Sequence, residues 1–109
     1  MELVERRKRM GYCYQLGEQG KTLATRPLGK ELRADLVGKA VGEDVVDLNF
    51  SGVLSTSHSF ADEFVARLAE EVKSGEVSFE LTISNASPGV ERVVRRALER
   101  RGVDLPLLV

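Results

Sequence analysis

One short stretch of the chain, SGVLSTSHSFADEF over residues 51–64, gathers four serines, one threonine and the only histidine of the sequence. The residue types of a hydrolytic triad occur in it, at Ser57, His58, Ser59 and Asp62. Neighbours in sequence point in different directions, whereas a working nucleophile and its base normally converge from separate elements. We therefore expect no catalytic residue and no enzyme activity, and we interpret the stretch as a binding or modification site.

A second stretch, GEQGKT over residues 17–22, ends as a phosphate-binding P-loop ends. The first glycine of that motif should lie five positions before Gly20, where Gln15 stands. Pro27 also delays the helix that should receive the phosphates. The stretch is typical of a turn, and we do not expect it to cradle a nucleotide.

The composition is that of an ordinary globular domain. The chain has 109 residues, of which 42% are hydrophobic and 30% charged, and this length suits one domain over residues 1–109. The formal net charge of -1 does not favour nucleic acid as a partner. One cysteine, Cys13, and one histidine leave no protein-only zinc set, so we expect no metal and no cofactor.

The two ends of the chain differ in character. The segment 1–9 is basic and contains ERRKR, which we interpret as a solvated terminus. The segment 105–109, LPLLV, is apolar, and we expect it to pack on the domain's own core or to mediate a homodimer. No apolar run is long enough to span a membrane and no signal peptide is evident, so we expect a cytoplasmic location without membrane contact.

The periodicity of apolar residues predicts the elements of the first half. YCYQL and KTLATR, separated by a glycine turn, predict a β-hairpin over residues 12–26. Pro27 predicts the start of a helix that ends near Gly38. The strand predicted over residues 45–50 has Val46, Leu48 and Phe50 on one side.

The second half follows the same logic. Apolar residues at helical spacing predict a helix over residues 60–73, and clean alternation predicts a strand over residues 77–84. Ser87 as N-cap, Pro88 in the first turn and Gly102 as stop predict the last helix.

The predicted fold class is therefore α/β, in the order β-β-α-β-α-β-α. Strands 45–50 and 77–84 flank a helix and should run parallel to each other. Because both strands alternate, one face of the sheet should be free of helices. We expect a small mixed β-sheet with helices mainly on one face.

The serine-rich stretch then falls at the carboxyl end of a parallel strand, where open α/β sheets present their sites. We predict that Ser59 caps the following helix and that Asp62 completes a capping-box-like pair.

Three stretches, LATR, NFSGVLSTSHSFADEF and SNASPGVERVVRRAL, resemble the STAS-like domain family of uncharacterised function. Phe50, Gly52 and Val53 followed by the Phe-Ala-Asp-Glu of residues 60–63 carry this resemblance, which spans roughly residues 20–100. It implies the STAS fold of the anti-sigma factor antagonists.

In those antagonists the equivalent loop carries Asp-Ser, and a GHKL-type ATPase phosphorylates that serine to control partner switching. By register the Asp falls on Ser57 and the acceptor on His58, while Asn49 stands where family members commonly have Asp. The phosphoacceptor candidates are therefore Ser57, Ser59 and His58, and binding without modification is our first expectation.

The resemblance implies a regulatory module that binds a protein partner, a GHKL-type ATPase or a regulator, through residues 51–63. The candidate contacts in this loop are Ser55, Ser57, His58, Ser59, Asp62 and Glu63. The alternative is a small-ligand or nucleotide-sensing domain, because some STAS domains bind nucleotides. Arg26 and Asn85, which fall where the family also tends to carry Arg and Asn, are the candidate ligand contacts, with Ser55 and Ser57 beside them.

Overall fold

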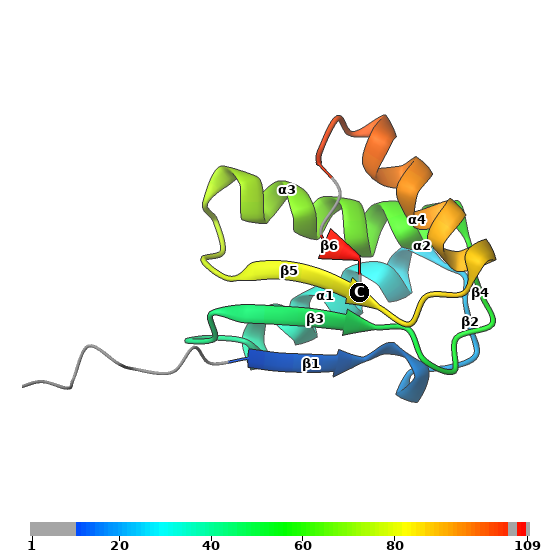
Figure 1. Ribbon diagram of the computed structural model, residues 1–109, viewed down its shortest axis with the longest axis horizontal. Helices are drawn as coiled ribbons and strands as arrows, with labels where there is room; N and C mark the ends of the chain where they lie inside the picture. Colours follow the sequence, from blue (N-terminus) through cyan, green and yellow to red (C-terminus); the bar gives the residue numbers. More distant parts are fainter. Residues whose placement is uncertain (1–10, 105–106, 109) are drawn as a thin grey trace, which may run out of the picture.

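The computed structural model describes residues 11–104 and 107–108 as a small α/β structure (Figure 1). Its strands are β1 (Gly11–Gln15), β2 (Thr22–Leu23), β3 (Val45–Asn49), β4 (Ser55–Thr56), β5 (Glu80–Ser84) and β6 (Leu107–Leu108). Its helices are α1 (Arg26–Lys39), α4 (Pro88–Arg100) and one continuous run made of α2 (His58–Ala61), η3 (Asp62–Ala66) and α3 (Arg67–Ser74). A short 3-10 turn, η2 (Leu16–Glu18), follows β1.

Every strand pair described is parallel. The larger sheet has the order β1-β3-β5-β6, and β2 pairs with β4 in a second sheet of two strands. The predicted hairpin is wrong, because β1 pairs with β3 while β2 crosses to β4. The turn after β1 is a 3-10 turn closed by a hydrogen bond from Gln19 N to Leu16 O, and it does not return the chain along β1. The predicted mixed sheet is therefore also wrong.

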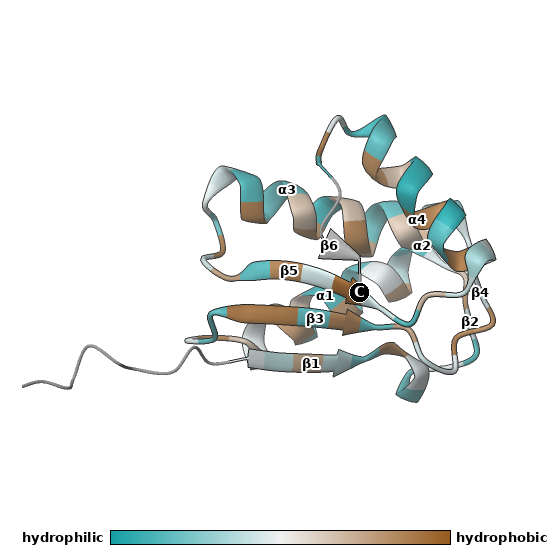
Figure 2. Ribbon diagram, in the orientation of Figure 1, coloured by the Kyte–Doolittle hydropathy of each residue, from teal (hydrophilic) through white to brown (hydrophobic). Residues whose placement is uncertain are grey.

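The predicted one-sided burial is confirmed. Along β3, Val46 and Leu48 are buried, while Asp47 and Asn49 are half-buried on the opposite face. β5 alternates in the same way, and it lies parallel to β3 as predicted. In Figure 1, α1 passes behind the strands, and no described helix crosses in front of β1, β3 or β5. Figure 2 shows brown and teal alternating along α3 and α4, as expected for helices with one buried face.

The middle helix is longer than predicted and contains an irregularity. It runs from His58 to Ser74, and its segment η3 is a π turn. α1 packs directly on this turn at Gly29, where an added Cβ would lie 3.1 Å from Glu63 Cβ and 3.2 Å from Phe60 O. The absence of a side chain at Gly29 thus lets the two helices approach each other closely.

The ends of the helices combine confirmed and corrected predictions. Ser87 caps α4 as predicted, accepting a hydrogen bond from Val90 N at 3.3 Å. Gly102 follows that helix with a φ of 64°, which suits glycine. The element order differs from the prediction because β4 and β6 add two short strands. β6 pairs with β5 and so places part of the apolar tail 105–109 at the sheet edge, whereas the basic segment 1–9 lies outside the described residues.

Across residues 11–104 and 107–108, none of the helices combines the length and apolar character needed to cross a membrane.

Candidate functional site

The loop between β3 and the middle helix is fixed by its own backbone. Leu54 N and Ser55 N both donate to Lys21 O, at 2.8 and 3.2 Å, and Ser57 N donates to Leu23 O at 3.0 Å. These bonds tie the loop to β2, so the small second sheet serves to position it. Ser51 at the start of the loop is exposed, and so are four side chains next to or within the first helical turn, Leu54, Ser55, His58 and Ser59, which we call the loop surface.

Leu54 is the unexpected member of the loop surface. Its side chain is 71% exposed, although it lies between the buried Val53 and the polar Ser55. Single exposed apolar side chains are common on protein surfaces, so Leu54 indicates a docking contact only together with the backbone hydrogen bonds that fix its loop. Sequence reasoning missed it, and the only available signal was an apolar residue in a loop without hydrophobic periodicity.

Ser57, rather than the predicted Ser59, caps the middle helix. Its Oγ accepts from Phe60 N at 2.9 Å and donates to Ala24 O at 2.7 Å. The prediction failed because the link between Ser57 N and Leu23 O places the start of the helix two residues earlier. Ser59 therefore lies exposed in the first turn, and Asp62 forms no capping box.

Asp62 belongs to an ion-pair network instead. Arg26 Nη1 and Arg101 Nη2 each donate to Asp62 Oδ2 at 2.8 Å. The hydrogen bonds from Arg101 hold the pKa of Asp62 far below its usual range; burial opposes this and Arg26 adds to it. Asp62 is thus a stable carboxylate at neutral pH, which suits a structural role better than proton transfer.

Glu63, the next residue, is buried among arginines. Only 6% of it is exposed, and its carboxylate accepts from Arg33 Nη2 at 2.8 Å and from Arg26 Nη1 at 3.1 Å. Burial raises the pKa of Glu63, but the hydrogen bonds from Arg33 and Arg26 outweigh it, so the net pKa is lowered. Arg33 also donates to Glu63 O and to Glu71. Glu63 therefore holds α1 to the π turn and is not part of the loop surface.

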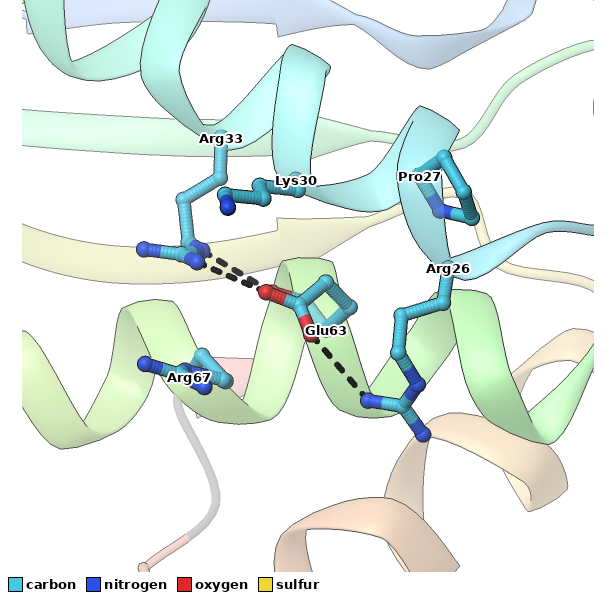
Figure 3. Close-up of a pocket in the computed structure, with 6 residues that line it drawn as sticks. All are labelled: Arg26, Pro27, Lys30, Arg33, Glu63 and Arg67. Carbon is cyan, nitrogen blue, oxygen red and sulfur yellow. Dashed lines mark hydrogen bonds and ion pairs between the residues drawn. The ribbon is translucent and has the colours of Figure 1, made fainter.

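Two hollows adjoin Arg26. The first, the basic pocket, has a volume of about 510 Å³ (Figure 3). It is lined by Arg26, Pro27, Lys30, Arg33, Glu63 and Arg67. The second, of about 230 Å³, is lined by Arg26, His58, Ser59, Asp62, Ala97 and Arg100. The structure therefore brings the candidate Arg26 together with His58, Ser59 and Asp62.

The sequence model of one protein family, described as a STAS-like domain of unknown function (DUF4325), matches residues 29–91. This chain belongs to that STAS-like family. No curated protein and no solved structure matches the chain. The STAS-like match contains the loop surface, Glu63 and Arg33, while Arg26 and Arg101 lie outside it.

Asn85, the other candidate ligand contact of this STAS-like domain, lies on the face of the sheet that the helices leave free. Its Nδ2 donates to Asn49 Oδ1 at 3.1 Å, and its φ of 57° places it in the left-handed region. On the same face Asp47 accepts from Thr82 Oγ1 at 2.7 Å and from Ser84. Asn85 thus fixes the ends of β3 and β5, and the structure shows no contact between it and Arg26. Among the described residues no group of three potential metal ligands is present.

Proposed function

We propose that this STAS-like domain is a non-enzymatic cytoplasmic regulatory module that binds a protein partner through the loop surface. The observation that carries the proposal is Leu54, 71% exposed on a loop held by backbone hydrogen bonds to β2. A rigid loop loses little conformational entropy on binding, and an exposed leucine gains stabilisation when a partner covers it. Ser55, His58 and Ser59 supply polar contacts around it.

The proposed partner is a GHKL-type ATPase or another regulator. The support comes from the resemblance to the anti-sigma factor antagonists, which use the loop at the same place in the STAS fold. Here too the loop lies after a parallel strand and before a helix. Direct docking through this loop requires no covalent modification, and we rank it first.

If the loop is phosphorylated, Ser59 is the acceptor that the geometry favours. The hydroxyl of Ser57 already donates to Ala24 O and caps the helix, whereas Ser59 is exposed. Ser59 shares its hollow with Arg26 and Arg100, whose guanidinium groups would pair with a phosphate. His58 lines the same hollow and is the second acceptor candidate.

A pull-down from extract of the cells that make the protein tests this proposal. The baits are the wild type, Leu54→Ser and the matched variant Val41→Ser, because Val41 is 80% exposed and precedes β3 whereas Leu54 follows it. We expect the wild type and Val41→Ser to recover the same ATPase or regulator and Leu54→Ser to lose it. Equal recovery by all three baits contradicts the loop assignment. Mass spectrometry of peptide 51–63 from the bait shows in the same experiment whether Ser59 carries a phosphate.

The second candidate function is small-ligand or nucleotide sensing, which the basic pocket supports. Of the candidate ligand contacts named from the sequence, Arg26 lines this pocket, whereas Ser55 and Ser57 do not. Ser57 instead caps the middle helix, and Ser55 belongs to the loop surface. Calorimetry with a panel of nucleotides tests it, and no heat with any nucleotide removes nucleotide sensing.

A further inference from the structure

The basic pocket concentrates positive charge in a chain whose formal net charge is -1. Four of its lining side chains are cationic and one is a carboxylate. Figure 3 shows Lys30, Arg33 and Arg67 on one side of the Glu63 carboxylate and Arg26 on the other. The hollow is thus a local exception to the charge balance of the domain, and its volume of about 510 Å³ lies within the usual range for small-molecule sites.

Two of these cations make no hydrogen bond or ion pair within residues 11–104 and 107–108. Arg26 and Arg33 bind Glu63, and Arg33 also binds Glu71. Lys30 and Arg67, by contrast, form no hydrogen bond or ion pair with any residue that the structure describes. The pocket therefore presents two ammonium or guanidinium groups whose donors are available to an anion.

The walls of the pocket are fixed in place by the fold. The π turn places Glu63 against Gly29, and Glu63 orients the guanidinium of Arg33, whose side chain is only 13% exposed. π turns inside α-helices occur frequently at functional sites. Arg67 begins α3 directly after the π turn, so the same irregularity sets its position on the pocket wall.

We propose that the basic pocket binds a small phosphate-bearing anion, with Lys30 and Arg67 as its principal charge contacts and Arg33, which donates to Glu63 and Glu71, as a fixed positive charge beside them. A phosphate or oligophosphate carries more than one negative charge and several acceptor oxygens, which suits clustered guanidinium and ammonium groups. The inference deepens the second candidate function and does not depend on partner docking at the loop surface.

Glu63 should influence both the position of the anion in the pocket and the kind of anion that binds. Its carboxylate repels an anion at the centre of the pocket, so the phosphate should lie on the side of Lys30, Arg33 and Arg67. A single monovalent anion gains little there because it must compete with Glu63 for Arg33. We therefore expect pyrophosphate to bind more tightly than chloride or acetate.

Calorimetric titration of the whole chain with pyrophosphate at low ionic strength tests the proposal. The test variant is the double substitution Lys30→Ala and Arg67→Ala. The control is Lys73→Ala with Arg96→Ala, which removes the same charge from exposed positions that do not line the pocket. We expect the test variant to weaken pyrophosphate binding at least tenfold and the control to stay within twofold of the wild type. Thermal melting should show both variants folded, because none of the four side chains has an ion-pair partner among the described residues.

Parallel titrations with ATP and adenosine, without metal ions, distinguish a site that accepts nucleotides from a site for inorganic oligophosphate. Binding of ATP with the same dependence on Lys30 and Arg67, and no binding of adenosine, supports a phosphate site that also accepts nucleotides. Binding of pyrophosphate but not ATP supports a site for inorganic oligophosphate. Absence of heat with both phosphate probes, or equal weakening in test and control variants, overturns the proposal. Leu54→Ser should bind pyrophosphate as the wild type does, so that failure here and failure of partner docking remain separate results.

Discussion

The loop surface and the basic pocket present functional groups by opposite means. The loop surface consists of side chains that make few contacts of their own and stand on a backbone tied to β2. The basic pocket consists of charged side chains that hold one another around the buried Glu63. At the loop surface the side chains are free for a partner because the backbone carries the structure. In the basic pocket some side chains carry the structure, whereas Lys30 and Arg67 make no hydrogen bond or ion pair with any described residue.

This difference predicts where substitutions damage the fold and where they damage only binding. The centre of the basic pocket should be intolerant, because loss of one partner leaves buried charge uncompensated. The loop surface should be tolerant, since its members bury little area.

The largest effect is expected at the centre of the pocket. Glu63→Gln leaves Arg33 and Arg26 without the carboxylate that joins them, and should lower the free energy of unfolding by about 3 kcal/mol. Urea denaturation measures it, with Glu31→Gln, exposed on α1, as a control that should change stability by less than about 0.5 kcal/mol. A loss of less than about 1 kcal/mol at Glu63 would contradict the view that ion pairs hold this region.

The neighbouring Asp62 should give a smaller loss that depends on pH. Its pKa is lower in the folded than in the unfolded chain, so its contribution is complete above the unfolded value of about 4 and fades as pH falls through the folded value. Asp62→Asn should lower stability by about 2 kcal/mol at pH 7, and the gap from the wild type should shrink as pH falls from 5 towards 2. Urea denaturation across this range measures the gap. A gap that stays constant would mean that the pairing with Arg101 contributes nothing.

The two glycines of α1 offer a matched test of the close approach to the π turn. A Cβ at Gly29 would meet Glu63, Phe60 and Phe64 within 3.1–3.3 Å, whereas nothing lies within 4 Å of one at Gly38. Gly29→Ala should destabilise by about 1 to 2 kcal/mol, and Gly38→Ala should stabilise by about 0.5 kcal/mol. Thermal denaturation compares them, and equal stabilisation by both would show that the helices are less tightly apposed.

Within the serine-rich stretch, Ser57 should contribute more to stability than Ser59, because Ser57 caps the middle helix. Ser57→Ala removes the bonds to Phe60 N and Ala24 O and should cost about 1 kcal/mol. Ser59→Ala removes an exposed hydroxyl and should cost less than about 0.3 kcal/mol. Denaturation measurements in which Ser59→Ala is the more destabilising substitution would show that Ser59 is the cap.

The smallest effect on stability is expected at the loop surface itself. Leu54→Ser should change the free energy of unfolding by less than about 0.5 kcal/mol, as should Val41→Ser, because both side chains are largely in solvent. A loss above about 1 kcal/mol at Leu54 would show that the leucine stabilises the loop and is not held out for a partner.

Much of the fold could be predicted from the sequence because alternation and capping are local signals. The one-sided strands β3 and β5 and the Ser87 cap followed from residue spacing alone. The partners of β1 and β2 did not follow from residue spacing. β1 pairs with β3 and β2 pairs with β4, and these partner strands lie more than 30 residues away along the chain. The same long-range tie to β2 moved the helix start from Ser59 to Ser57.

The position of the serine-rich stretch in the fold could be predicted from the sequence, whereas the environments of its side chains could not. The serine-rich stretch lies between a parallel strand and a helix, as predicted, while its role in binding stays a prediction. Its sequence does not show that Glu63 is buried, because a π turn and a glycine from another helix together create that environment. Nor does it show that Leu54 is exposed, since a leucine gives the same hydrophobic signal in either environment.

The most direct test is to measure the affinity of the recovered partner for two purified variants, Leu54→Ser and the Lys30→Ala, Arg67→Ala pair. If the loop surface is the docking site, Leu54→Ser binds the partner at least tenfold more weakly than the wild type while the pocket variant keeps wild-type affinity. The opposite result, with partner affinity lost in the pocket variant and kept in Leu54→Ser, would contradict the assignment of partner binding to the loop.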